Sequence, residues 1–116
     1  MYEYSARLVR PVDADTWILH IDLGLRTWAH DVRIRAAGLN APELSTPEGS
    51  AALRWVIGWF GQHCPDGILT VKTQKDRSDN YGRLLGTITA PNGACLNADL
   101  LATGHAEPWP RATAPA

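Results

Sequence analysis

Residues 33–43 of the chain read RIRAAGLNAPE and join the end of a strand to a polar loop. Apolar and charged residues alternate over residues 31–36, which is the pattern of a strand with one apolar and one charged face. Gly38 then lets the backbone turn, and Pro42 fixes a bend directly before Glu43. An arginine, an amide and a carboxylate therefore gather at the end of one strand, and we expect any chemistry of this protein there.

Composition indicates one globular domain. The 116 residues are 45% hydrophobic and 20% charged, which is enough apolar material to bury a core. The net charge of −1 argues against a general polyanion binder but allows a local basic cleft. The first residues lack the basic and apolar regions of a signal peptide, and no apolar run reaches membrane-spanning length. We therefore expect a cytoplasmic protein with no membrane association.

The order of the remaining elements predicts the fold class. Alternating patterns predict strands over residues 2–10, 16–23, 26–37, 68–75 and 83–90, and helical patterns predict helices over residues 47–64 and 95–103. Thr46 suits the N-cap of the longer helix, Pro47 its first position and Glu48 its positive end. This order is typical of a mainly β (α+β) five-stranded Greek-key barrel of the OB type. One helix lies between the third and fourth predicted strands, and a short one follows the fifth.

Side-chain spacing also predicts which faces are buried. The inward positions of the two helices are Leu53, Val56, Ile57, Phe60, Cys64, Leu96, Leu100 and Leu101. We expect residues 1–104 to form the OB-fold domain. Residues 105–116 contain three prolines and many alanines, and we expect them to be an extended or disordered tail.

Three polar segments, residues 13–16, 35–43 and 79–83, contain side chains that could bind a metal ion or a phosphate. Oxygen groups such as those of Asp15 and Asn40, with a backbone carbonyl, suit Ca²⁺ or Mg²⁺. Paired arginines such as Arg35 and Arg83 match the oxygens of a phosphate, and a carboxylate such as Glu43 can position or deprotonate a water. Each segment alone is more often ordinary turn, loop or surface chemistry. Together they indicate phosphodiester hydrolysis.

The motifs also resemble a known family in their order along the chain. Residues 12–16, 35–43, 46–52 and 79–83 resemble the staphylococcal nuclease (thermonuclease) family, and the resemblance extends over residues 7–104. It implies an OB-fold and a Ca²⁺-dependent nuclease that cleaves DNA or RNA, with Mg²⁺ or Mn²⁺ as alternative ions.

The resemblance also implies a role for each matching residue. Metal ligands of the family are matched by Asp15, Asn40 and the backbone carbonyl of Ala41, its phosphate-binding arginines by Arg35 and Arg83, and its general base by Glu43. Tyr81 matches a tyrosine of the nucleotide pocket, and Asn80 stands at a substrate-binding position where the family often has a lysine. Asn40 stands where the family has an aspartate. Because a unit-charge pair near 4 Å is worth roughly 4 kcal/mol at a surface-like dielectric, we expect weakened metal binding.

The same residues are also compatible with functions that do not involve catalysis. Without its metal, the chain would be a catalytically impaired OB-fold module that binds nucleic acid or a protein partner. Trp55 and Trp59 lie one helical turn apart, and they either pack the helix or form an exposed patch for a partner or a homodimer. His20 and His30 lie where they can pair across two strands, and we interpret them as structural or surface residues.

Overall fold

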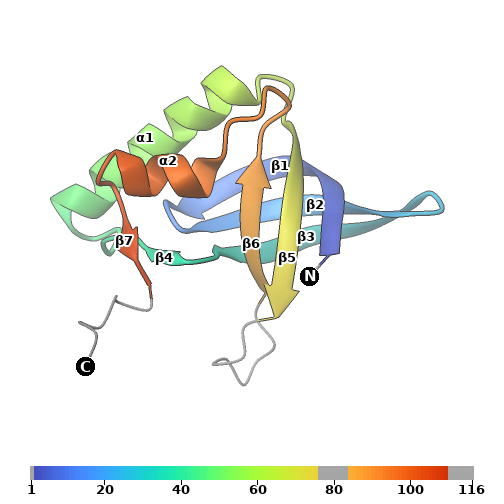
Figure 1. Cartoon of the computed structure of the whole chain (residues 1–116), viewed down its shortest axis with the longest axis horizontal. Helices are drawn as coiled ribbons and strands as arrows, with labels where there is room; N and C mark the ends of the chain where they lie inside the picture. The colour runs from blue at the N-terminus through green and yellow to red at the C-terminus, as the bar shows by residue number, and fades with distance from the viewer. Residues whose placement is uncertain (1, 76–83, 110–116) are drawn as a thin grey trace.

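The computed structural model describes residues 2–75 and 84–109. Within them the chain forms a closed five-stranded barrel in the order β1-β2-β3-β6-β5 (Figure 1). The barrel strands are β1 (Tyr2–Asp13), β2 (Thr16–Gly24), β3 (Thr27–Ala36), β5 (Ile68–Lys75) and β6 (Leu84–Thr89). Every neighbouring pair is antiparallel except β3 and β6, which close the barrel in parallel. The prediction of a mainly β, OB-type α+β barrel is therefore confirmed.

Strand β1 continues beyond Pro11, where the sequence predicted its end. It reaches Asp13, and its pairing with β2 shifts register between Leu8 and Arg10 and again between Pro11 and Asp13. A β-bulge tolerates proline because one residue there makes no ladder hydrogen bond. The extension carries β1 into the turn that holds Asp15.

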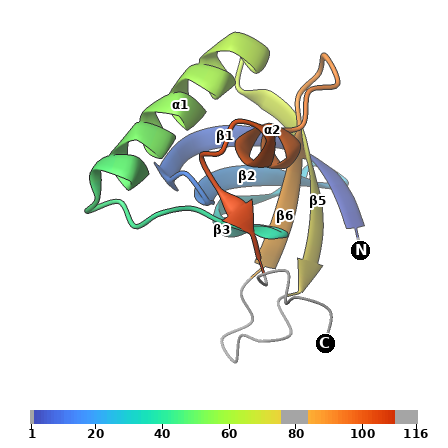
Figure 2. The same cartoon turned by 60° about the vertical axis from the view of Figure 1, so that its left-hand side comes forward.

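Two helices pack on the barrel and on each other (Figures 1 and 2). Helix α1 (Pro47–His63) contacts β1, and helix α2 (Leu96–Ala102) contacts β6. The predicted start of α1 is confirmed, because the Thr46 side chain accepts a hydrogen bond from the Gly49 amide and Pro47 lies in the first turn. No helix within residues 2–75 and 84–109 is long and apolar enough to cross a membrane.

The buried faces of the helices differ from the prediction at two positions. Ile57 and Leu101 were expected inward, but they are 53% and 37% exposed. In α1 the buried stripe instead contains Trp59, whose Nε1 donates a 2.8 Å hydrogen bond to the Asp99 carboxylate of α2. Trp59 therefore packs α1 against α2 and does not form an exposed patch.

Asn97 is buried on α2 and joins that helix to the parallel closure of the barrel. Its Oδ1 accepts a hydrogen bond from the Ile88 amide at 3.0 Å. Its Nδ2 donates to the carbonyl oxygens of Ala37 and Gly86 at 3.1 and 3.0 Å. One side chain thus satisfies three backbone groups where β3 meets β6, and burial of this amide is stabilising because all of its partners are present.

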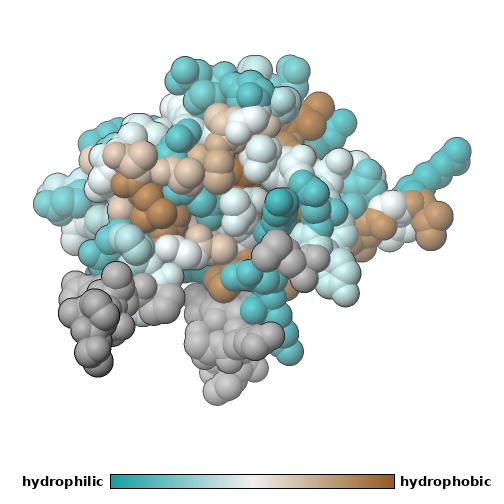
Figure 3. Space-filling view, viewed as in Figure 1, coloured by the Kyte–Doolittle hydropathy of each residue, from teal (hydrophilic) through white to brown (hydrophobic). Residues whose placement is uncertain are grey.

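Strands β2 and β3 also form a hairpin that projects from the molecule (Figures 1 and 3). Its tip residues Leu25 and Arg26 have φ values of 54° and 61°, and Leu25 is 99% exposed. Within this hairpin His20 and His30 pair as expected, with ring centroids 4.7 Å apart in an edge-on arrangement.

A second, two-stranded sheet was not predicted. Strand β4 (Leu39–Asn40) pairs with β7 (Glu107–Pro108), and the amide of Trp109 donates to the Gly38 carbonyl at 3.0 Å. Ala106 is only 9% exposed. Within residues 105–109 only Glu107 and Pro108 form a strand, and this segment lies against the barrel end that carries Asn40. Residues 110–116 fall outside the described part of the chain.

Candidate functional site

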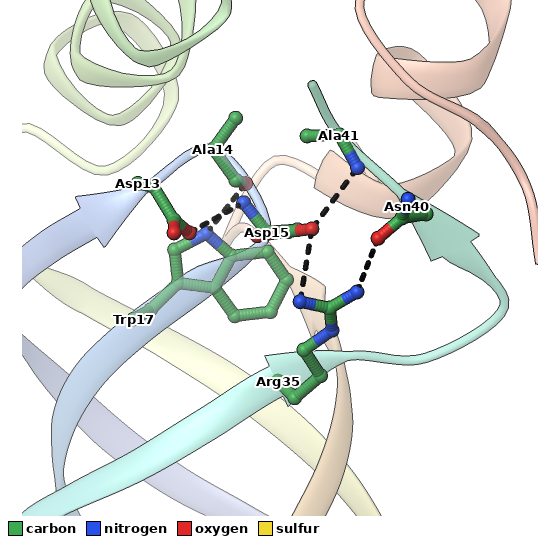
Figure 4. Close-up of polar contacts among 7 residues, drawn as sticks. All are labelled: Asp13, Ala14, Asp15, Trp17, Arg35, Asn40 and Ala41. Carbon is green, nitrogen blue, oxygen red and sulfur yellow. Dashed lines mark hydrogen bonds and ion pairs between the residues drawn. The ribbon is translucent and has the colours of Figure 1, made fainter. Parts of the chain in front are cut away.

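The candidate site forms where β3 ends beside the turn between β1 and β2 (Figure 4). Thr16 opens β2 and pairs with Arg35 of β3, so the preceding residue Asp15 lies next to that arginine. The backbone reinforces this contact, because the Ala36 amide donates to the Asp15 carbonyl at 2.8 Å. Beyond Gly38 the chain returns as β4 and brings Asn40 to the same place.

Four residues predicted from the sequence meet there. Arg35 Nη1 forms an ion pair with Asp15 Oδ2 at 3.1 Å, and the two side chains are 22% and 6% exposed, respectively. Arg35 Nη2 donates a short hydrogen bond to Asn40 Oδ1. The Ala41 amide donates to Asp15 Oδ2 at 3.0 Å. These contacts form a closed ring, which we call the Asp15–Arg35–Asn40 cluster.

Asp13 adds a second carboxylate beside Asp15. The Asp15 amide donates to Asp13 Oδ1 at 3.2 Å, and Trp17 Nε1 braces the same turn through the Ala14 carbonyl at 3.1 Å. Burial, together with the hydrogen bond and charge of the Asp15 side chain, raises the pKa of Asp13 to about 6. Burial is the largest cause of the raised pKa, and the neighbouring Asp15 carboxylate adds to it.

The oxygen donors at this end of the barrel are of the type that a hard divalent cation prefers. Asp13, Asp15 and Asn40 supply carboxylate and amide oxygens, the ligands that Ca²⁺ and Mg²⁺ prefer. Arg35 already occupies Asp15 Oδ2 and Asn40 Oδ1, so a cation competes with the guanidinium for them. Among the described residues, no three His, Cys, Asp or Glu side chains cluster closely enough to hold a metal, so any site here depends on amide or backbone oxygens.

Ala41 meets the cluster through its amide N–H. The sequence-based expectation concerned its carbonyl oxygen, whereas the observed hydrogen bond to Asp15 uses the N–H of the preceding peptide group, between Asn40 and Ala41. The Ala41 N–H and the Arg35 guanidinium both contact Oδ2 of the buried Asp15 carboxylate.

Glu43 is exposed and lies just beyond the cluster along the chain. Its carbonyl oxygen accepts hydrogen bonds from the Thr46 amide at 3.0 Å and the Thr46 hydroxyl at 2.6 Å. The first turn of α1 also presses on this segment, because a Cβ at Gly49 would collide with the Glu43 carbonyl and lie 2.8 Å from the Pro42 oxygen. The N-terminus of α1 therefore fixes the backbone at Glu43. No hydrogen bond or ion pair joins the Glu43 carboxylate to another described residue.

The other predicted site residues, Asn80, Tyr81 and Arg83, lie outside the described residues. The described chain resumes at Leu84, which pairs with Ile34 next to Arg35.

A cavity of about 320 Å³ adjoins the cluster and contains residues that the sequence did not single out. It is lined by Asn40, Ala41, Pro42, Gly104, His105, Ala106 and Glu107. His105 and Glu107 were assigned only to the tail. No local pattern marks them, because they reach the site only through the pairing of β7 with β4.

The fold and the site define a small α+β protein of the OB-barrel class with an arginine, carboxylate and amide cluster at one end of the barrel. No family model matches the chain. The chain is similar to Endonuclease YhcR of Bacillus subtilis (strain 168), with 30% identity over 121 aligned residues. The alignment covers 93% of this chain but 9% of that protein, so the chain spans less than a tenth of its length. This similarity and the five-stranded barrel fit an OB-fold of the staphylococcal nuclease type.

Proposed function

We propose that this chain is a nuclease domain that hydrolyses phosphodiester bonds in DNA or RNA. The observation that carries the proposal is the placement of Arg35. Its guanidinium is held by Asp15 and Asn40, yet its side chain remains 22% exposed at the barrel end. The similarity to a segment of an endonuclease supports the same conclusion.

Arg35 is suited to bind the scissile phosphate. A guanidinium has five N–H donors in a fixed plane, and the two contacts to Asp15 and Asn40 leave others for phosphate oxygens. Because those contacts hold the group before substrate arrives, little reorganisation is needed when charge develops on the phosphate. We assign Arg83 as the second phosphate ligand and Tyr81 and Asn80 as nucleotide contacts, on the sequence motif alone.

Glu43 is proposed as the general base that accepts a proton from the attacking water. Its backbone is fixed by Thr46 and the first turn of α1, while its side chain is exposed to solvent. The Glu43 carboxylate is therefore accessible to a water molecule, while the backbone that carries it is held in place.

We propose Ca²⁺ as the cofactor, with Mg²⁺ or Mn²⁺ as alternatives. Asp15, Asn40 and the carbonyl oxygen of Ala41 would hold the ion, and Asp13 lies close enough to Asp15 to add negative charge. When bound, a divalent cation polarises a phosphoryl oxygen and favours ionisation of water. The chain's own contribution is to hold these oxygens and to keep Arg35 beside them.

A cleavage assay tests the proposal. The purified protein should degrade DNA or RNA in Ca²⁺, Mg²⁺ or Mn²⁺, and EDTA should stop the reaction. Glu43→Gln and Arg83→Ala should each remove most of the activity. Arg54→Ala, which removes an exposed arginine on α1, serves as the control and should have no effect. If neither site variant alters cleavage, the site is wrongly assigned.

One observation favours a second candidate, a nucleic-acid-binding module without catalysis. Arg35 engages both Asp15 Oδ2 and Asn40 Oδ1, so a cation that binds these two oxygens has to share them with the guanidinium. Calorimetric titration separates the two functions. Absence of Ca²⁺ or Mg²⁺ binding at millimolar concentration, with retained binding of single-stranded nucleic acid, supports the binding module.

A further inference from the structure

The cavity lies between residues 40–42, at the end of β4, and residues 104–107, which lead into β7. It adjoins the Asp15–Arg35–Asn40 cluster, because Asn40 belongs to both. Its volume of about 320 Å³ is at the lower end of the range of roughly 300–1,000 Å³ for small-ligand sites. A space of this size suits one nucleobase or nucleoside and is too small for a longer piece of a strand.

Glu107 lines this cavity and is the acidic residue of its lining. It is the direct antiparallel partner of Asn40, and side chains of opposed residues lie on the same face of a sheet, with Cβ atoms about 4.5–5.5 Å apart. Asn40 in turn contacts Arg35. Asn40 therefore lies between Glu107, its cross-strand partner, and the Arg35 guanidinium that is proposed to bind phosphate.

Residues 104–107, which line the cavity opposite Asn40, are held in place by contacts with α1 and α2. Gly104 has a φ of 78° and turns the chain out of α2, and the Ala106 amide then donates to the Leu100 carbonyl at 3.2 Å. The half-buried imidazole of His105 stacks against Trp55, with ring centroids 5.1 Å apart and an interplanar angle of 30°. These contacts anchor the segment that carries Glu107, as a site that must discriminate between ligands requires.

We propose that this cavity binds the base of the nucleotide adjoining the phosphate on Arg35 and that Glu107 makes it selective for guanine. This inference rests on the proposed function. The charge of Glu107 disfavours a phosphate in the cavity, whereas the Arg35 guanidinium attracts one. The phosphate is thereby assigned to Arg35 and the base to the neighbouring cavity.

The chemistry of the bases determines the selectivity. Guanine presents an imino N–H and an amino group side by side, and the two oxygens of one carboxylate accept from both. Adenine and cytosine offer a single amino group on the corresponding edge. Uracil and thymine offer one N–H between two carbonyl oxygens, which a carboxylate repels. Recognition of unpaired bases through these edges is common in single-strand binding sites.

The test uses single-stranded oligonucleotides of uridine or thymidine that contain one guanosine, adenosine or cytidine. Product ends are mapped, and the readout is the ratio of cleavage at the phosphates adjoining each inserted base to cleavage elsewhere. We expect about a tenfold preference beside guanosine. Glu107→Gln should lower that ratio close to one, because the glutamine amide places an N–H donor against the donors of guanine. Glu3→Gln, an exposed substitution on β1, is the matched control and should leave the ratio unchanged.

The outcomes distinguish this inference from the proposed function. Cleavage without base preference, preference for another base, or a guanosine preference that Glu107→Gln does not alter overturns the inference and leaves the nuclease intact. Absence of any cleavage by the wild-type protein overturns the proposed function. Nucleotide binding then tests whether the cavity selects guanine. Titration with GMP and UMP, followed by NMR, supports the inference if only GMP binds and Glu107→Gln abolishes that binding. Equal binding or none overturns it. Thermal melts confirm that the variants fold.

Discussion

Arg35 contacts one charged side chain, Asp15, and one neutral side chain, Asn40, so only one of its two partners contributes negative charge to the site. It forms an ion pair with Asp15 and a hydrogen bond with Asn40. Asp13 and Asp15 together carry more negative charge than one guanidinium neutralises, and the pKa of Asp13 rises to about 6 as a result of burial and of Asp15. Changes at these residues should therefore alter cation binding and pH dependence in predictable directions.

Asn40→Asp should tighten Ca²⁺ binding. The substitution adds a carboxylate beside Asp15, and a unit charge about 4 Å from another is worth roughly 4 kcal/mol at a surface-like dielectric. Repulsion from Asp15 offsets part of this gain, so we expect a gain in affinity of about ten- to a hundredfold. Calorimetric titration with Ca²⁺ measures the change. Asn92→Asp adds the same charge in the turn between β6 and α2 and should have no effect. Equal affinities for wild type and Asn40→Asp would remove Asn40 from the ligand set.

Asp13→Asn should stabilise the protein at neutral pH and change its pH dependence. The pKa of Asp13 is about 6 in the folded protein and near 3.8 in the unfolded chain. Between about pH 4 and pH 6 the folded state therefore binds a proton that the unfolded state does not, and wild-type stability falls as the pH rises through this window. The asparagine keeps an oxygen for the Asp15 amide and removes the titrating charge.

Urea unfolding at pH 4, 5, 6 and 7 measures this effect. The stability difference between Asp13→Asn and wild type should grow with pH and reach on the order of 1–2 kcal/mol at pH 7. Parallel stability curves for the two proteins across this range would show that Asp13 ionises normally.

At the level of elements, the N-terminus of α1 supports the segment that carries Glu43. The Thr46 N-cap binds the Glu43 carbonyl, and Gly49 allows the first turn of the helix to approach it closely. A helix predicted from its capping residues thereby also positions the proposed general base.

Gly49→Ala should disturb this support. The new Cβ would collide with the Glu43 backbone, which cannot rotate away as a flexible side chain can. We expect a loss of about 1–3 kcal/mol in stability and at least a tenfold loss of cleavage activity. Thermal melting and the cleavage assay measure the two effects.

Gly58→Ala is the control for this prediction. It lies on the same helix with nothing within 4 Å of the added Cβ, and it should raise stability by up to about 1 kcal/mol. If Gly49→Ala behaves like Gly58→Ala, close packing at Gly49 does not position Glu43.

At the level of the whole molecule, β7 completes the barrel end that carries the site. Its pairing with β4 covers Ala106 and joins residues far apart in the sequence, from Gly38 to Trp109. Asn40 is therefore held from two directions, by Arg35 and by the strand opposite.

A chain ending at Gly104 should be less stable than one ending at Trp109. The shorter chain loses the partner strand of β4 and the burial of Ala106, which we estimate at about 1–3 kcal/mol, or several degrees in melting temperature. Differential scanning calorimetry of the two proteins measures the difference. Identical melting temperatures would show that residues 105–109 add no stability to the domain expected over residues 1–104.

Local chemistry explains what was predictable. The alternation around Ile34 predicted the third strand, and Thr46 with Pro47 predicted the start of α1, because both signals depend only on neighbours in the chain. The choice of Trp59 over Ile57 for the buried face was not predictable, because helical spacing permits both and the Asp99 carboxylate of α2 selects the tryptophan. The burial of Asn97 follows from backbone groups exposed where β3 joins β6, which exist only in the closed barrel.

The sequence by itself therefore determined the five barrel strands, the two helices and the residue types available for chemistry at Asp15, Arg35 and Asn40. Only the tertiary structure decided that Arg35 engages both Asp15 and Asn40, and that Glu107 and His105 line a cavity beside them. The physical reason is range. Periodicity and capping act over a few residues, whereas ion pairs and cross-strand pairs form between residues that meet only after the barrel closes.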